Sequence, residues 1–159
     1  MQSAAMLTGG LDTVAHICYI WHTMNEGNAP KPLFWIGSSK KDLKAFPIVV
    51  RRLMGFALWQ AQSGYKHADA KPLKGFGGAG VLEIVADHEG NTFRAVYTIR
   101  LAKAVYVLHA FKKKSKKGVK TPKQVIELIR RRLKRGEEHY AEWNKTQSEE
   151  AAEGEGRAE

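Results

Sequence analysis

Three segments between residues 81 and 111 either alternate hydrophobic and polar residues or form short hydrophobic runs, which indicates β-strands. The strands expected there cover residues 81–86, 92–100 and 105–111, and the short turns between them predict an antiparallel meander. An earlier hydrophobic run, residues 32–36, ends at a glycine and is typical of an edge strand.

Hydrophobic residues recur every three or four positions in other parts of the chain, which predicts helices. A capping-box-like start at Ser39 predicts a short helix, and a second helix follows from Pro47 until Gly64 stops it. A longer helix is expected from Pro122 to about Trp143. The order is then β-α-α-β-β-β-α, an α+β fold in which a small antiparallel sheet of about four strands packs against helices.

The middle strand of the meander has two distinct faces. Phe93, Ala95 and Tyr97 lie on one side, whereas Arg94 and Arg100 lie on the other. Two arginines are unexpected on a face buried against helices, so we expect this face on the open side of the sheet.

The chain of 159 residues is long enough for one domain with a real core, which we place at residues 31–143. Residues 1–30 have no clear period and are interpreted as an N-terminal extension, with Met24 as an alternative translation start; a short N-terminal helix is the other interpretation. Residues 144–159 are acidic and are expected to be a disordered tail.

Charge is the unusual feature of the composition. The formal net charge is +10, and residues 112–135 hold twelve Lys or Arg against one acid. Such a run favours a polyanionic partner, although a solvated helix face would have the same composition. No hydrophobic run approaches the length of a membrane span, and Cys18 is the only cysteine, so we expect a cytoplasmic protein without a disulfide framework.

The residues give little support to a metal site or a nucleotide-binding loop. The six histidines are scattered without metal-ligand spacing, so neither a metal nor a cofactor is expected. The glycine-rich segment 71–80 lacks a following Gly-Lys-Ser/Thr, which argues against a phosphate-binding loop.

What remains is a cationic cluster that could bind RNA or cleave it. Cleavage needs no metal if the 2′-hydroxyl attacks the adjacent phosphate, but it needs a base, cationic donors for the developing charge, and a proton for the leaving oxygen. Electrostatic binding alone is the simpler interpretation. The cluster consists of Lys71, Lys74, Arg94, Arg100, Lys112, Lys113, Lys114, Lys116, Lys117 and Lys120.

Several motifs in the right order resemble those of phage-derived RelE/HigB-like toxins of type II toxin–antitoxin systems. VLHAFKKKSKK (residues 107–117) followed by KTP (120–122) is similar to their segment before the last helix, and FRAVY (93–97) resembles their arginine–tyrosine strand. KPLKG (71–75), VLEI (81–84) and KDLKAFP (41–47) extend the match, which covers roughly residues 31–140.

The resemblance implies a RelE-like fold, ribosome-dependent cleavage of mRNA, and neutralisation by a cognate antitoxin, often a helix-turn-helix protein of the HigA kind. Arg94 matches the arginine that stabilises the scissile phosphate, and Lys113 and Lys114 match the paired lysines after the phenylalanine. Tyr97 matches the strand tyrosine, which either packs or takes part in the chemistry. Glu83 matches the strand glutamate, which is either an ion-pair partner or a general base.

One departure concerns the acid and base. Well-studied members carry lysines on the first hairpin strand, but residues 81–93 contain none, so His109 or Glu83 could substitute. The alternatives are a non-catalytic RNA- or ribosome-binding protein of the same fold, a structural or regulatory phage-type protein, and a ParE-type toxin that acts on DNA gyrase. The remaining cations (Lys71, Lys74, Arg100, Lys112, Lys116, Lys117 and Lys120) are expected to dock RNA.

Overall fold

The computed structural model describes residues 29–77, 80–113 and 121–155. The N-terminal extension up to residue 28, including Met24, and the lysines at positions 114, 116, 117 and 120 lie outside these residues. The elements in chain order are β1 (Leu33–Trp35), α2 (Ser39–Lys44), α3 (Ile48–Gln62), β2 (Ala70–Pro72), β3 (Val81–His88), β4 (Asn91–Thr98), β5 (Val105–Lys113) and α4 (Lys123–Glu155).

The five strands form one sheet in the order β1-β5-β4-β3-β2. The α+β class and the expected antiparallel meander β3-β4-β5 are confirmed. Two details differ from expectation. β1 pairs with β5 in parallel, so the sheet is mixed, and β2 is an additional edge strand for which the sequence analysis predicted no strand.

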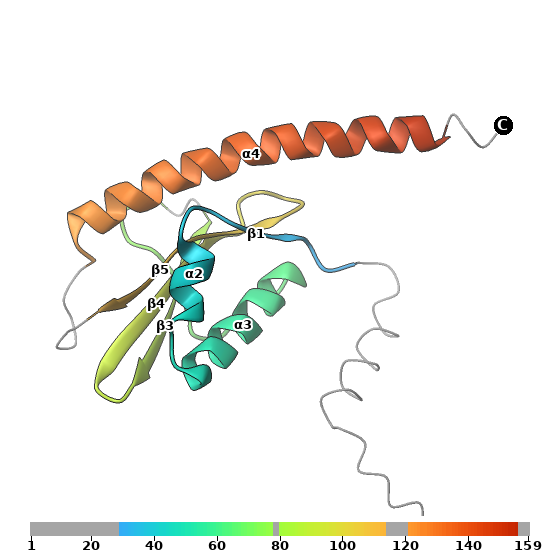
Figure 1. Cartoon of the computed structure of the whole chain (residues 1–159). Coiled ribbons are helices and arrows are strands. Elements are labelled where there is room, and N and C mark those ends of the chain that lie inside the picture. The colour runs from blue at the N-terminus through green and yellow to red at the C-terminus, as the bar shows by residue number, and fades with distance from the viewer. Residues whose placement is uncertain (1–28, 78–79, 114–120, 156–159) are drawn as a thin grey trace, which may run out of the picture.

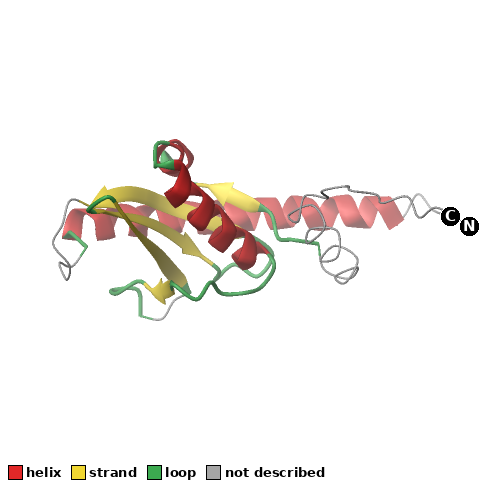
Figure 2. Cartoon of the chain, turned by 90° about the horizontal axis from the view of Figure 1, so that it is seen from below, coloured by secondary structure: helices red, strands yellow, loops and turns green. Residues whose placement is uncertain are grey.

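Helices cover both faces of the sheet (Figures 1 and 2). On one face α2 and α3 pack with the inward residues of β3, β4 and β5, and the core includes Met54, Ile84 and Phe93. On the other face α4 packs through Ile129 and Leu133 against Val81, Val96, Tyr106 and Leu108. The face that bears Arg94 is therefore the α4-side face, and the expectation of an open face was wrong.

The serine at the start of α2 has a different role from the expected cap. Ser38 is the N-cap residue and makes no side-chain capping bond, whereas Ser39 is buried and donates a hydrogen bond from Oγ to the carbonyl of Val107 (3.1 Å). The hydroxyl thus connects α2 to β5.

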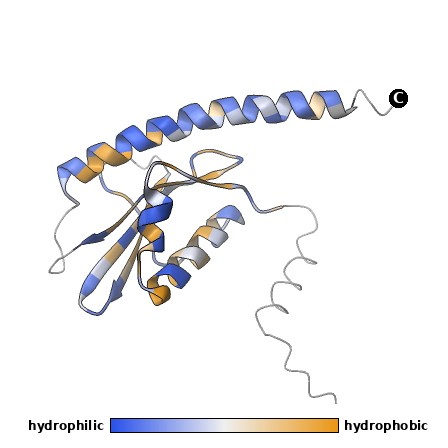
Figure 3. Cartoon of the chain, in the orientation of Figure 1, coloured by the Kyte–Doolittle hydropathy of each residue, from blue (hydrophilic) through white to orange (hydrophobic). Residues whose placement is uncertain are grey.

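The last helix is longer than expected. It continues through residue 155, twelve residues beyond Trp143, whereas disorder was expected from residue 144. Figure 1 shows this part of α4 projecting past the sheet, and Figure 3 shows that its residues are mostly hydrophilic. The segment has no proline and is rich in alanine and glutamate, and Lys145 pairs with Glu149 one turn later, all of which favour helix.

Because every side chain described between residues 145 and 153 is exposed, this projection should contribute little to the stability of the domain. We expect that ending the chain after Lys145 changes the free energy of unfolding by no more than about 0.5 kcal/mol, as for other surface changes. Urea denaturation of the shortened and full-length chains measures it. A loss above about 1.5 kcal/mol would show that the projection packs on the domain.

Candidate functional site

One face of the sheet collects five of the polar side chains that the sequence singled out. Side chains alternate along a strand, and partners in register share a face, so the pairing decides which residues meet. Arg94 of β4 pairs with Val85 of β3 and with Phe111 of β5. Its diagonal neighbours on the same face are Glu83, Asp87, His109 and Lys113, and such neighbours lie ~7–8 Å apart. Asp87 lies near the hairpin, where it is exposed and accepts a hydrogen bond from Oγ1 of Thr92.

The strip extends to the edge of the sheet through Lys71. This residue lies in β2 directly opposite Glu83 and is exposed. The sheet therefore brings together Lys71, Glu83, Arg94, His109 and Lys113, and we call this set the polar strip. It includes three of the five expected catalytic residues, and one residue, Lys71, that was expected only to dock RNA.

Arg94 and Glu83 form an ion pair at the centre of the polar strip. Nη1 of Arg94 donates to Oε2 of Glu83 over 2.6 Å, and the two side chains are 17% and 14% exposed. The pair favours the interpretation of Glu83 as an ion-pair partner in the resting protein. Nε of Arg94 is buried and has no acceptor among the described residues. Because a guanidinium has five N–H donors, the pair leaves Arg94 able to donate to a phosphate as well.

Tyr97 lies on the opposite face of the sheet. It is fully buried in the core against α2 and α3, and burial raises the pKa of its hydroxyl to about 12. Its hydroxyl finds no partner among the described residues. The geometry separates Tyr97 from the polar strip and favours packing over chemistry.

This placement can be tested with Tyr97→Phe. We expect the variant to keep its activity and its free energy of unfolding, or to gain stability, because the change removes a buried hydroxyl whose desolvation no described residue compensates. Urea denaturation and a toxicity assay check the two expectations. A hundredfold loss of activity in a fully folded variant would show that Tyr97 takes part in the chemistry.

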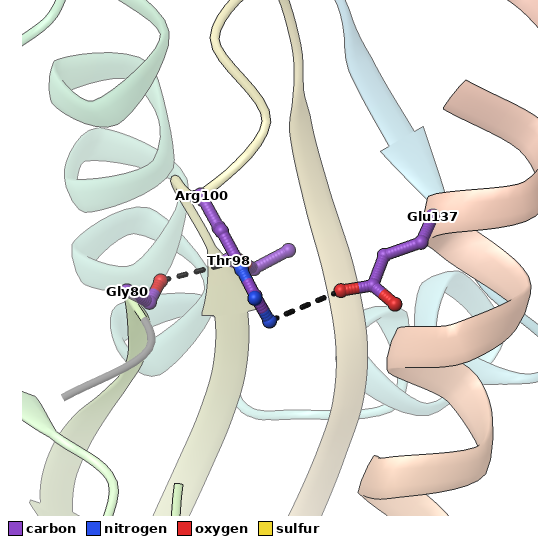
Figure 4. A network of polar contacts seen from close by, with 4 residues as sticks. All are labelled: Gly80, Thr98, Arg100 and Glu137. Carbon is purple, nitrogen blue, oxygen red and sulfur yellow. Dashed lines mark hydrogen bonds and ion pairs between the residues drawn. The ribbon is translucent and has the colours of Figure 1, made fainter. Parts of the chain in front are cut away.

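Arg100 does not join Arg94. β4 ends at Thr98, so Arg100 lies beyond the strand and its Nη1 contacts Oε1 of Glu137 in α4 at 3.2 Å (Figure 4). The backbone of the same turn is held by Thr98, whose Oγ1 donates to the carbonyl of Gly80 and accepts from the N–H of Arg100. The arginine thus contacts α4 at the surface rather than extending the polar strip.

The remaining expected cations are divided between surfaces. Lys112 lies with its ammonium 5.8 Å from the ring centre of Phe93, on the face opposite Lys113. Lys74 is exposed in the turn after β2, beside Gly75, whose carbonyl accepts a hydrogen bond from Arg130 of α4 (2.9 Å). Lys71, Lys74 and Arg130 therefore form a cationic edge on the α4 side of the sheet.

Two arginines of α4 are candidate functional residues that the sequence did not indicate. Arg130 completes the cationic edge, and Arg132 donates from Nη1 to Nδ1 of His109 (3.0 Å). Both belong to a run of basic residues in an amphipathic helix, which looks like a solvated face. Their contacts span 55 and 23 residues of sequence, so no local pattern could have indicated them.

Among the described residues there is no group of three or more His, Cys, Asp or Glu side chains that could hold a metal ion. In the same part of the chain no helix is long and apolar enough to cross a membrane. The polar strip offers cations, the mostly buried carboxylate of Glu83 and the imidazole of His109.

The class of protein follows from the fold together with a comparison with known families. A mixed five-stranded sheet covered by helices is compatible with a small RelE-like α+β fold. The model of a known family, described as phage-derived protein Gp49-like (DUF891), matches residues 41–134, more than half of the chain. The chain therefore belongs to this family, which is a RelE/toxin-like family of toxin–antitoxin systems and implies an antitoxin partner. Neither a curated protein nor a solved structure gives a significant match.

Proposed function

We propose that this protein is a cytoplasmic toxin of the RelE/HigB kind that cleaves mRNA on the ribosome and is neutralised by a helix-turn-helix antitoxin. The observation that carries the proposal is the polar strip, which lines up Lys71, Arg94 and Lys113 beside one carboxylate, Glu83. RNA fits both parts of this set. The scissile phosphate is an anion for the cations to bind, and the adjacent 2′-hydroxyl has a proton that the carboxylate can accept.

The reaction that fits these groups is an internal transfer. The 2′-hydroxyl loses its proton to the carboxylate of Glu83 and attacks the adjacent phosphorus, and the bond to the 5′-oxygen breaks to leave a 2′,3′-cyclic phosphate. Arg94 donates to the phosphate oxygens as charge develops on them, and the ammonium of Lys113 or Lys114 protonates the leaving 5′-oxygen. The ion pair engages Oε2 of Glu83, and the arriving phosphate competes with this oxygen for the guanidinium.

The charges of α4 also support a polyanionic target. Its first thirteen residues, 123–135, contain six Lys or Arg and one Glu, whereas the acids are concentrated in its second half. A helix prefers acids in its first turn and cations in its last turn, whereas α4 has Lys123 at its start and Glu153 and Glu155 at its end. The basic half is better explained by contacts with RNA, in which Lys71, Lys74 and Arg130 on the cationic edge take part.

The test is induced expression followed by mapping of 5′ ends. The proposal expects growth arrest, cleavage of translated messages with 5′-hydroxyl ends, and relief of both by co-expression of the antitoxin. Growth arrest with intact messages and impaired supercoiling would instead indicate a ParE-type toxin, which acts on gyrase.

The buried Arg94–Glu83 pair favours a second candidate, a non-catalytic RNA- or ribosome-binding protein. In that case the pair would hold the sheet together, and exposed cations such as Lys71 and Arg130 would bind phosphates. Binding would then fall steeply with salt, because each phosphate contact releases counterions, and no cleavage products would form.

A further inference from the structure

His109 lies on the polar strip but differs from its other members in having a partner that constrains its chemistry. The residue pairs with Val96, is half-buried, and stacks on Phe111 with ring centres 5.1 Å apart and planes inclined by 20°. Its Nδ1 lies 3.0 Å from Nη1 of Arg132. The stacking and the polar contact together hold the ring in one orientation.

Arg132 is itself held at three places. Nη1 also donates to the carbonyl of Leu108 (2.9 Å), and Nη2 donates to Oγ of Ser38 (2.8 Å). The backbone at Gly37 passes so close that an added Cβ would lie 3.1 Å from the guanidinium, and its φ of +59° also favours glycine. A guanidinium anchored to β5 and to the start of α2 is a rigid donor.

The direction of the hydrogen bond decides which proton the imidazole carries. Arginine donates but cannot accept, so Nδ1 of His109 must contribute its lone pair. A neutral imidazole with an accepting Nδ1 carries its proton on Nε2. In this form Nε2 can donate a hydrogen bond, but it has no lone pair with which to remove a proton from a hydroxyl.

The surroundings favour this neutral form. Burial and then the charge of Arg132 lower the pKa of His109, and Asp42 of α2 opposes them more weakly. The charged groups on the same face of the neighbouring strands are Arg94, Lys113, Lys71, Asp87 and Glu83, and Glu83 is paired with Arg94.

We propose that Arg132 is a positioning residue that fixes His109 as a neutral Nε2–H donor, and that His109 binds the scissile phosphate rather than acting as the general base. The proposal rests on the proposed function for its substrate. It replaces the hypothesis that His109 supplies the missing base and leaves that role to Glu83. No proton is transferred through His109, so its contribution is a hydrogen bond that strengthens as the phosphate gains charge.

The tautomer can be measured without any activity. Long-range ¹H–¹⁵N spectra of the full-length protein at pH 7.5 should show a protonated Nε2 and an unprotonated Nδ1 for His109. In Arg132→Met, which keeps an unbranched stem but loses the donors, we expect a mixture of tautomers and a His109 pKa closer to the ordinary 6.5. Arg131→Met, the same change at the exposed neighbour, should leave the His109 signals unchanged.

Activity separates a donor from a base. Glutamine keeps an N–H near the Nε2 position but cannot act as a base, so His109→Gln should retain cleavage within about tenfold, whereas His109→Ala should lose on the order of a hundredfold. Equal losses in both variants would overturn the donor role. A protonated Nδ1 in the wild type, or an unchanged spectrum in Arg132→Met, would overturn the positioning role of Arg132. If the wild type cleaves no RNA, the proposed function and the donor role both fail, but the spectra still decide what Arg132 does.

Discussion

The double substitution Arg94→Ala, Lys113→Ala should abolish message cleavage and growth arrest. In the proposed reaction Arg94 donates to the phosphate and Lys113 or Lys114 protonates the leaving oxygen, and loss of one well-placed donor typically costs on the order of 10²–10³ in rate. Both residues lie on the α4-side face, and Lys113 is a diagonal neighbour of Arg94 across the β4–β5 pair. The measurement is the cleavage rate of a reporter message on purified ribosomes, with growth after induction as the cellular readout.

The neighbouring lysine offers a matched control. Lys112→Ala is the same change one position away, but this side chain lies on the opposite face near Phe93. We therefore expect a far smaller loss from Lys112→Ala than from Lys113→Ala. Equal losses would mean that the basic segment acts through its overall charge rather than through the position of Lys113.

Folding must be separated from chemistry, because Arg94→Ala leaves the carboxylate of Glu83 mostly buried without its partner. Removing one partner of a buried ion pair is strongly destabilising. Arg94→Lys keeps a cation beside Glu83 but loses the planar fork, so it should remain folded and still lose at least about tenfold in rate. A folded double variant that arrests growth as well as the wild type would show that the polar strip is not the active site.

Ile129→Ala should destabilise the protein by about 2–5 kcal/mol, the usual range when a buried isoleucine is cut to alanine. Ile129 is fully buried between α4 and the sheet, where it packs in the same cluster as Val96, Tyr106 and Leu108. The change leaves a cavity under the helix that carries Arg132. Urea denaturation measures the loss.

The control for this change is Ile48→Ala, the same truncation at the first residue of α3, where the side chain is 51% exposed. We expect less than about 0.5 kcal/mol there, as for other exposed positions. If Ile129→Ala cost no more than Ile48→Ala, α4 would not be packed on the sheet in solution, and the contact between Arg132 and His109 would lose its support.

Much of the local structure could be predicted because its causes are local. The alternation of Phe93, Ala95 and Tyr97 with Arg94 and Val96 indicated a strand with two different faces, and the structure has that strand. The three- and four-residue spacing that ends at Trp143 indicated α4. The error in the predicted end of α4 has a local reason as well. The acidic composition after residue 144 suggested disorder, although the alanines and glutamates of this segment also favour helix.

The candidate site was predictable as a set of residue types but not as a set of neighbours. Motif resemblance indicated Arg94, Glu83 and Lys113 as candidates. The same motifs included Tyr97, whose side chain lies on the opposite face because side chains alternate along the strand. Arg132 and the cross-strand position of Lys71 could not be found in this way.

The sequence alone determined that this is a basic α+β protein with a cationic strand pair before a long final helix, because periodicity and charge are properties of neighbouring residues. Only the tertiary structure decided that β1 joins β5 in parallel, that Arg94 is paired with Glu83, and that Arg132 constrains His109. These features depend on strand register and on where α4 crosses the sheet, and both are set by the packing of the whole core rather than by any single segment.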